Sequence, residues 1–183
     1  MSLLHRLEIN VAIRLNNDPS APIDHVDTVT FDSTSVNDTY VKDVLPNEWI
    51  DSWPAESLKA GAMAVKMYGW YHVLYPKYPL VGADVDNTVN CQVYKPNSFQ
   101  PNSTSAVDAI HSQGFRRNWK WVDPYIFETS YYAGTYDASA TDGEHMTQNG
   151  SHYWADQGKT YDWILRFYYD SSDIYTHEEF FTY

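Results

Sequence analysis

The most continuous hydrophobic stretch of the chain runs from Pro54 to Tyr75 and predicts one long, buried helix. Its only formal charges are Glu56, Lys59 and Lys66, and most other residues are Ala, Gly, Leu, Val, Met, Trp or Tyr. A helix that is apolar on all sides is normally buried, and its small residues let neighbouring elements approach closely. We therefore expect this helix to lie at the centre of the fold.

A shorter helix is predicted before it, ending close to Pro46. A proline disfavours helical geometry at the residue before it, so this helix should end near residue 45. Pro54 suits the first turn of the long helix, because its missing N–H is not needed there. Glu48 then falls in the connector, close to Trp49 and Trp53.

The two lysines of the long helix lie on one line along its surface. Lys59 and Lys66 are about two turns apart, and Trp70 lies about one turn beyond. Lysine is almost never fully buried without a partner, so this line should face water, a carboxylate or a ligand. A narrow solvated stripe or a pair of structural ion pairs explains the pattern as well as a ligand site does.

The remaining pattern predicts an α+β fold in a single domain over residues 1–183. Alternating positions indicate strands, and an apolar helical pattern closes the chain. The expected strands are Leu7 to Leu15, His25 to Phe31 and Tyr125 to Tyr136, and the closing helix is Tyr161 to Tyr169. Residues 96–105 and 137–149 are expected to be polar loops. We expect a long central helix and shorter helices packed on a mainly antiparallel sheet.

Composition narrows the classes of function. The chain has 183 residues, of which 43% are hydrophobic and 16% aromatic, so it can bury a sizeable core. Its net charge of -12 argues against nucleic acid or an anionic membrane as a partner. No apolar segment has transmembrane length, so membrane insertion of this chain is not expected. The single cysteine, Cys91, excludes an internal disulfide.

Three segments resemble the stage II sporulation protein D family, the sporulation lytic transglycosylases and amidase enhancers. They are YVKDVLPNEWIDSWPAESLKAGAMAVKMY at 40–68, CQVY at 91–94 and MTQNGSHYWADQGKTYDWILRFYY at 146–169. The resemblance implies a lytic transglycosylase, a carbon–oxygen lyase that cleaves muramic acid–glucosamine bonds of peptide-stripped peptidoglycan strands to 1,6-anhydro products. The alternative that it implies is a noncatalytic glycan-binding enhancer of a cell-wall amidase. It also implies an extracytoplasmic role in sporulation or cell-wall remodelling, with the anchor or signal sequence outside this sequence.

The resemblance makes Glu48 the catalytic candidate. Glycoside hydrolysis ordinarily uses two carboxyl groups, whereas a transglycosylase manages with one because the 6-hydroxyl of muramic acid is the nucleophile. Glu48 would protonate the departing oxygen and then accept the hydroxyl proton. Trp49 and Trp53 would favour its neutral form, and a helix N-terminus with nearby lysines the charged form. A carboxylate that caps the long helix is the structural alternative.

Substrate-binding residues follow from the same resemblance. Lys59 and Lys66 would pair with the lactyl carboxylates of muramic acid, although relatives usually have arginine at the second position. Trp70 is the candidate platform for a sugar ring. Tyr131 lies in a segment that lines the cleft in relatives. Relatives typically have Gly-His-Gly-x-Gly-Met-Ser-Gln near residue 148. In this chain Gln148 matches that motif, whereas two of its glycines are absent.

No metal and no cofactor are expected. Relatives often carry Cys and His spaced for zinc after the long helix, whereas the segment ADVDNTVNCQVY offers only Cys91. We predict that Cys91 is a small buried thiol. Asp84 and Asp86 are more typical of turn or cap residues than of a cation site. A different hydrolase is also conceivable from the seven histidines, but no Gly-x-Ser-x-Gly motif is present.

Overall fold

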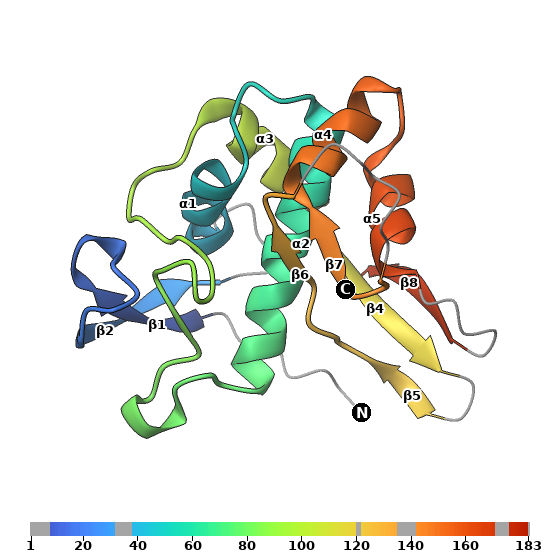
Figure 1. Ribbon diagram of the computed structural model, residues 1–183. Helices are drawn as coiled ribbons and strands as arrows, with labels where there is room; N and C mark the ends of the chain where they lie inside the picture. Colours follow the sequence, from blue (N-terminus) through green and yellow to red (C-terminus); the bar gives the residue numbers. More distant parts are fainter. Residues whose placement is uncertain (1–7, 32–37, 120–121, 135–141, 171–175, 183) are drawn as a thin grey trace.

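The computed structural model in Figure 1 describes residues 8–31, 38–119, 122–134, 142–170 and 176–182. Its helices are α1 (Thr39–Glu48), α2 (Ala55–Leu74), α3 (Pro101–Ile110), α4 (Gln148–Asp156) and α5 (Tyr161–Tyr169). Short 3-10 turns cover Leu15–Asn17 and Pro79–Val81. The strands are β1 (Glu8–Arg14), β2 (Ile23–Thr30), β3 (Val85–Asp86), β4 (Gln113–Trp119), β5 (Val122–Tyr125), β6 (Ser130–Tyr132), β7 (His145–Thr147) and β8 (Thr176–Thr182).

Helix α2 forms the centre of the molecule, as the hydrophobic pattern predicted. It packs against α1, α3, α4, α5 and β4, and all but a few of its residues are buried. Its glycines permit the close packing: a Cβ atom at Gly61 would lie 2.6 Å from Cδ2 of Trp49. No helix within the described ranges is both long and apolar enough to cross a membrane.

In the part of the chain that the structure describes, three small sheets lie around α2 instead of one larger sheet. In Figure 1, β1 and β2 lie on one side of α2, and β4, β5 and β8 lie on the other. Strand β1 pairs antiparallel with β2 and parallel with β3, and β4 pairs antiparallel with both β5 and β8. Strands β6 and β7 form a separate parallel pair. The predicted α+β class is confirmed.

Several predicted boundaries agree with the structure and others are wrong. The first two strands and α5 lie where the pattern placed them. The strand predicted from Tyr125 to Tyr136 is instead the end of β5, an irregular stretch and β6, and residues 135–141 lie outside the described residues. The predicted loops contain the start of α3, β7 and the start of α4. Helix α3 was not predicted because its first half is polar in sequence. It nevertheless buries Ser103, Ala106, Val107 and Ile110.

Helix α1 continues past Pro46, contrary to the prediction that it ends near residue 45. Pro46 lies inside the helix, and the Trp49 N–H bonds to the Leu45 carbonyl at 2.7 Å. Pro46 lacks the N–H that would bond to the Lys42 carbonyl, so it removes one intrahelical hydrogen bond, and the bond between Trp49 and Leu45 still closes the last turn. Glu48 is therefore the last residue of α1 and not part of a connector.

Candidate active site around Glu48

The carboxylate of Glu48 is held by two donors from distant parts of the chain. Its Oε1 accepts a hydrogen bond from the backbone N–H of Val93 at 2.7 Å, and its Oε2 accepts one from the side-chain amide of Gln148 at 3.1 Å. The same amide donates to the backbone oxygen of Glu48 at 2.9 Å. Both donors lie outside α2. The carboxylate of Glu48 therefore links the end of α1 to α4 and to the segment before α3.

Burial dominates the electrostatics of this carboxyl group. Removal from water raises the pKa of Glu48 above the ordinary value of 4.5, while the hydrogen bonds from Val93 and Gln148 act in the opposite direction. The net pKa is raised. The protonated form is therefore more abundant at a given pH than for an exposed glutamate, which suits a general acid.

Trp49 is a buried aromatic residue next to Glu48 in the sequence. It is 1% exposed, its indole N–H donates to the Ser151 hydroxyl at 3.0 Å, and its ring lies 4.9 Å from the ring of Tyr131. The other tryptophan of this segment, Trp53, stacks on His152 at 4.7 Å. These contacts tie the end of α1 to α4.

Gln92 is a positioning residue that the sequence analysis did not single out. Its buried side-chain amide accepts from the Tyr40 hydroxyl at 2.9 Å and donates to the Tyr131 hydroxyl at 3.0 Å. It also donates to the Val65 carbonyl of α2 at 3.3 Å. These bonds fix the chain next to Val93, whose N–H holds Glu48. The CQVY motif was the sequence signal for this residue.

A pocket of about 350 Å³ lies next to these residues. Its lining includes Tyr68, Lys77, Cys91, Glu128, Tyr131 and Tyr132. Tyr131 belongs both to this lining and to the packing around Trp49, and Cys91 directly precedes Gln92. Glu48 and Gln148 are not among the residues that line this pocket. Of the candidate residues, Gln148 contacts Glu48 directly, and Tyr131 lines the pocket and packs on Trp49, the neighbour of Glu48 in the sequence.

Lys66 and Trp70 do not face this site, and their predicted contact with substrate is wrong. Lys66 is 1% exposed, and its ammonium donates to the carbonyls of His111 and Gln113, each at 2.7 Å. Trp70 is 3% exposed, with its ring 6.0 Å from the ring of Phe181. Backbone carbonyls beyond the end of a helix lack intrahelical partners and can satisfy a buried ammonium as a ligand would.

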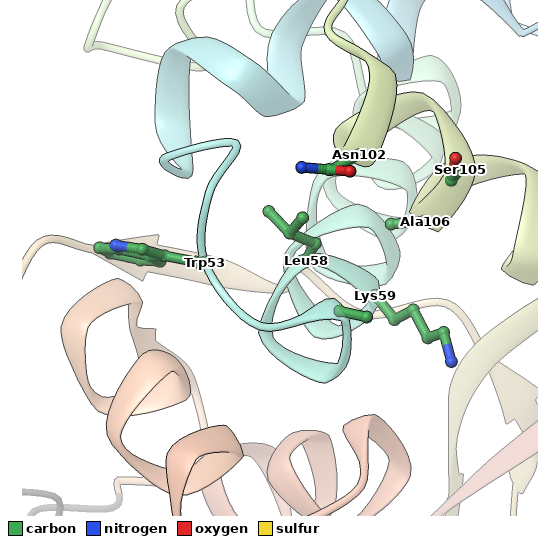
Figure 2. A pocket seen from close by; sticks show the side chains of 7 residues that line it. Trp53, Leu58, Lys59, Asn102, Ser105 and Ala106 are labelled. Atoms are coloured by element: carbon green, nitrogen blue, oxygen red, sulfur yellow. The ribbon is translucent and has the colours of Figure 1, made fainter.

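Lys59 lies at a different cavity. Its side chain is 28% exposed and pairs with Glu56 at 2.7 Å. The cavity of about 290 Å³ lies between α2 and α3, and Figure 2 shows Lys59 on its rim with Trp53 and Asn102 among the other lining residues. Glu48 is not among the residues that line it. A role for Lys59 in substrate binding stays a prediction.

The aspartates after α2 serve the backbone and the fold. Asp84 accepts from the N–H of Asn10 at 2.8 Å, and Asp86 accepts from the Arg14 guanidinium at 3.0 Å. Cys91 is a free, partly buried thiol whose pKa is raised by burial. Within the described ranges, no cluster of three or more His, Cys, Asp or Glu side chains is arranged to hold a metal ion.

Comparison with known proteins identifies the family of this region. Residues 27–114, about half of the chain, match the family model described as a stage II sporulation protein. This range contains α1, α2, Glu48 and the CQVY segment, so this part of the chain belongs to the stage II sporulation protein D family, as its motifs predicted. The family is associated with sporulation and with lytic activity on the cell wall.

One curated relative shows similarity over a shorter range. An uncharacterized protein of Brachyspira hyodysenteriae is 51% identical over 57 residues. The match covers 30% of this chain and 15% of the relative, so the chain spans only a small part of that protein's length. This relative is described as uncharacterized and adds no activity to the comparison.

Proposed function

We propose that this chain is a lytic transglycosylase that cleaves muramic acid–glucosamine bonds in peptide-stripped peptidoglycan and leaves 1,6-anhydro ends. The supporting observation is the carboxyl group of Glu48, which lies in the family region and has a raised pKa. Its hydrogen bonds from Val93 and Gln148 hold it in one orientation. A buried, oriented carboxyl group with a raised pKa is what a general acid requires.

Glu48 carries the proton in both directions in the proposed reaction. The carboxyl group gives its proton to the glycosidic oxygen as the bond from that oxygen to C1 of muramic acid breaks. The 6-hydroxyl oxygen of the same muramic acid forms the new bond to C1, and its proton passes to the Glu48 carboxylate. The carboxyl group is thereby regenerated, and no water is consumed.

The surroundings of other acids favour a reaction with one carboxyl group. Glu56 pairs with Lys59 and accepts from the backbone N–H of Tyr161 at 2.7 Å. Glu128 lies 3.2 Å from a ring nitrogen of His72. Hydrolysis by the usual two-carboxylate route needs a second acid facing the same bond. The pairing of Glu56 with Lys59 supports transglycosylation over hydrolysis, whereas Glu128 lines the neighbouring pocket and can contact the glycan there.

The remaining parts of the site act through Glu48 or through the strand. Gln148 orients the carboxyl group, and Tyr131 packs on Trp49 and lines the neighbouring pocket. Lys59, partly exposed at the cavity between α2 and α3, would contact a more distant part of the glycan. The proposed setting is the cell wall outside the cytoplasmic membrane, in sporulation or in wall remodelling, with a peptide-removing amidase acting beforehand.

Product analysis tests this proposal. Peptidoglycan would be incubated with the protein, with and without prior amidase treatment, and the soluble products measured by mass spectrometry. Anhydro-muramyl fragments, more abundant after amidase treatment, are expected. Reducing-end sugars would instead indicate a hydrolase with a second carboxylate, and binding without cleavage would indicate a noncatalytic enhancer of an amidase.

A further inference from the structure

The pocket beside Tyr131 contains a cation that the function above does not use. Lys77 lies in the segment after α2, and its ammonium donates to the Tyr68 hydroxyl at 2.8 Å and to the Asn90 carbonyl at 3.0 Å. Both acceptors are neutral. An ammonium group has three donors, so one remains for a ligand in the pocket.

The backbone around Lys77 is fixed, so its position is built into the fold. Its N–H bonds to the Asp84 carbonyl at 3.0 Å, and Tyr78 and Ala83 form an antiparallel bridge. Asp84 in turn accepts from the N–H of Asn10 in β1. The lysine is therefore held at the pocket by hydrogen bonds that reach a strand of the core.

The other charged side chains that line this pocket have partners. Glu128 lies 3.2 Å from a ring nitrogen of His72, and His145 lies 2.7 Å from Asp142. Among the described residues no carboxylate pairs with Lys77. A single unpaired ammonium beside neutral acceptors favours a ligand with one negative charge, and Glu128 on the same lining disfavours a second.

We propose that Lys77 binds the lactyl carboxylate of a muramic acid residue in the pocket lined by Tyr68, Lys77, Cys91, Glu128, Tyr131 and Tyr132. This inference rests on the proposed function, because that function supplies the glycan. Tyr132 is 49% exposed and presents its ring to the sugar, and Glu128 accepts from a sugar hydroxyl or acetamido N–H. Lys77 thus takes the role that the resemblance suggested for Lys59 and Lys66.

The lactyl carboxylate explains a preference for peptide-stripped strands. In peptide-bearing strands this group is an amide and carries no charge, whereas removal of the peptide frees the carboxylate. A charge-assisted hydrogen bond to an ammonium is roughly twice as strong as a neutral one. Lys77 would therefore separate the two kinds of strand at the binding step, before any bond is cleaved.

Binding to an inactive protein tests this inference separately from catalysis. In a Glu48→Gln background, affinity would be measured by calorimetry for peptide-free peptidoglycan oligosaccharides and for chitooligosaccharides of equal length, which lack the lactyl carboxylate. We expect the first ligand to bind about tenfold more tightly. Lys77→Met should remove this difference, and Lys77→Arg should retain most of it. Lys159→Met is the matched control, because it removes the same charge from a lysine whose ammonium lies 4.7 Å from the Trp163 ring centroid.

The outcomes distinguish the two claims. Equal affinities for the two ligands, or a Lys77→Met change that weakens both alike, would overturn the role of Lys77. Carboxylate-selective binding that depends on Lys77, in a protein that cleaves nothing when Glu48 is present, would refute the transglycosylase and leave the binding site standing. Cleavage by the unmodified protein, with no effect of Lys77→Met on binding selectivity, would refute the binding role of Lys77 and leave the transglycosylase standing.

Discussion

The side-chain amide of Gln148 donates to Glu48 twice, to Oε2 at 3.1 Å and to the backbone oxygen at 2.9 Å. The two residues are 100 positions apart, and they join the last residue of α1 to the first residue of α4. Strand β7 ends immediately before Gln148, so its pairing with β6 sets where the amide lies. This contact fixes the direction in which the carboxyl group of Glu48 points.

Gln148→Met should change the pH dependence of cleavage. The hydrogen bond from Gln148 lowers the pKa of Glu48, so its loss should raise that pKa further. A hydrogen bond to the charged form favours that form, so its removal favours the protonated acid. The activity that depends on the protonated acid should extend to higher pH, with a lower maximum rate because the carboxyl group is less well oriented. Rates measured between pH 4 and 8 check this.

Gln157→Met, at the exposed far end of α4, is the control for that experiment. Its pH profile should match that of the unmodified protein. An unchanged profile for Gln148→Met as well would show that Gln148 does not act on the proton of Glu48.

The raised pKa of Glu48 also predicts a dependence of stability on pH. A carboxyl group whose pKa is higher in the folded than in the unfolded state favours folding at low pH. This contribution is complete below the ordinary carboxyl pKa of 4.5 and is lost as the pH rises through the raised value. The unmodified protein should therefore lose stability relative to Glu48→Gln as the pH rises from below 4.5 through the raised pKa of Glu48.

Urea unfolding of both proteins at several pH values measures this difference. A constant difference across the range would mean that the folded and unfolded pKa values are equal. A relative gain of stability by the unmodified protein with rising pH would mean that the folded pKa is lowered, contrary to the burial of Glu48.

Gly61→Ala should disturb the site through Trp49. The added Cβ would lie 2.6 Å from Cδ2 of the buried Trp49 ring, which cannot move freely because its N–H is bonded to Ser151. Overpacking of this kind costs about 1–3 kcal/mol, and Glu48 is adjacent in sequence. We expect lower stability and lower cleavage. Gly69→Ala on the same helix meets Phe31 only at 3.2 Å and should lower stability less, with cleavage retained. Thermal unfolding and rates for both variants provide the comparison.

Lys66→Met should destabilise the fold and leave ligand selectivity unchanged. Its ammonium holds the carbonyls that follow α3, and the loss of such charged hydrogen bonds from a buried position costs about 3 kcal/mol. Residual folded protein should show the same preference for peptide-free strands as the unmodified protein. A stable variant with lost selectivity would restore the role that the sequence suggested.

The hydrophobic pattern predicted the central helix, and the motif singled out Glu48, whose catalytic role stays a prediction. The sequence did not predict which groups the lysines contact. Helix α2 is recognisable because its apolar residues cover every face, and Glu48 because it stands in a motif next to tryptophans. Periodicity places Lys66 on a line but does not say what faces that line. The carbonyls of His111 and Gln113 come from a turn about 45 residues later in the chain, and no local pattern reveals them.

The sequence also did not predict the contacts made by short elements. Strand β7 has three residues and lies in a segment that looks like polar loop, and its neighbour in β6 is parallel. Such pairs depend on tertiary contacts more than on local propensity. The sequence did not indicate Lys77 as a ligand-binding residue, because it lies in a Pro-rich segment with no helical or strand period. Its position at the pocket depends on the hydrogen bonds to the Tyr68 hydroxyl and the Asn90 carbonyl.

Mass spectrometry of products released from amidase-treated glycan strands by the unmodified protein and by Glu48→Gln tests the central claim most directly. We expect 1,6-anhydro-muramyl fragments, lighter by one water than the hydrolysis products, from the unmodified protein. The Glu48→Gln protein should release at most one thousandth as much while remaining folded. Anhydro products formed at an unchanged rate by Glu48→Gln would contradict the role given to this carboxyl group.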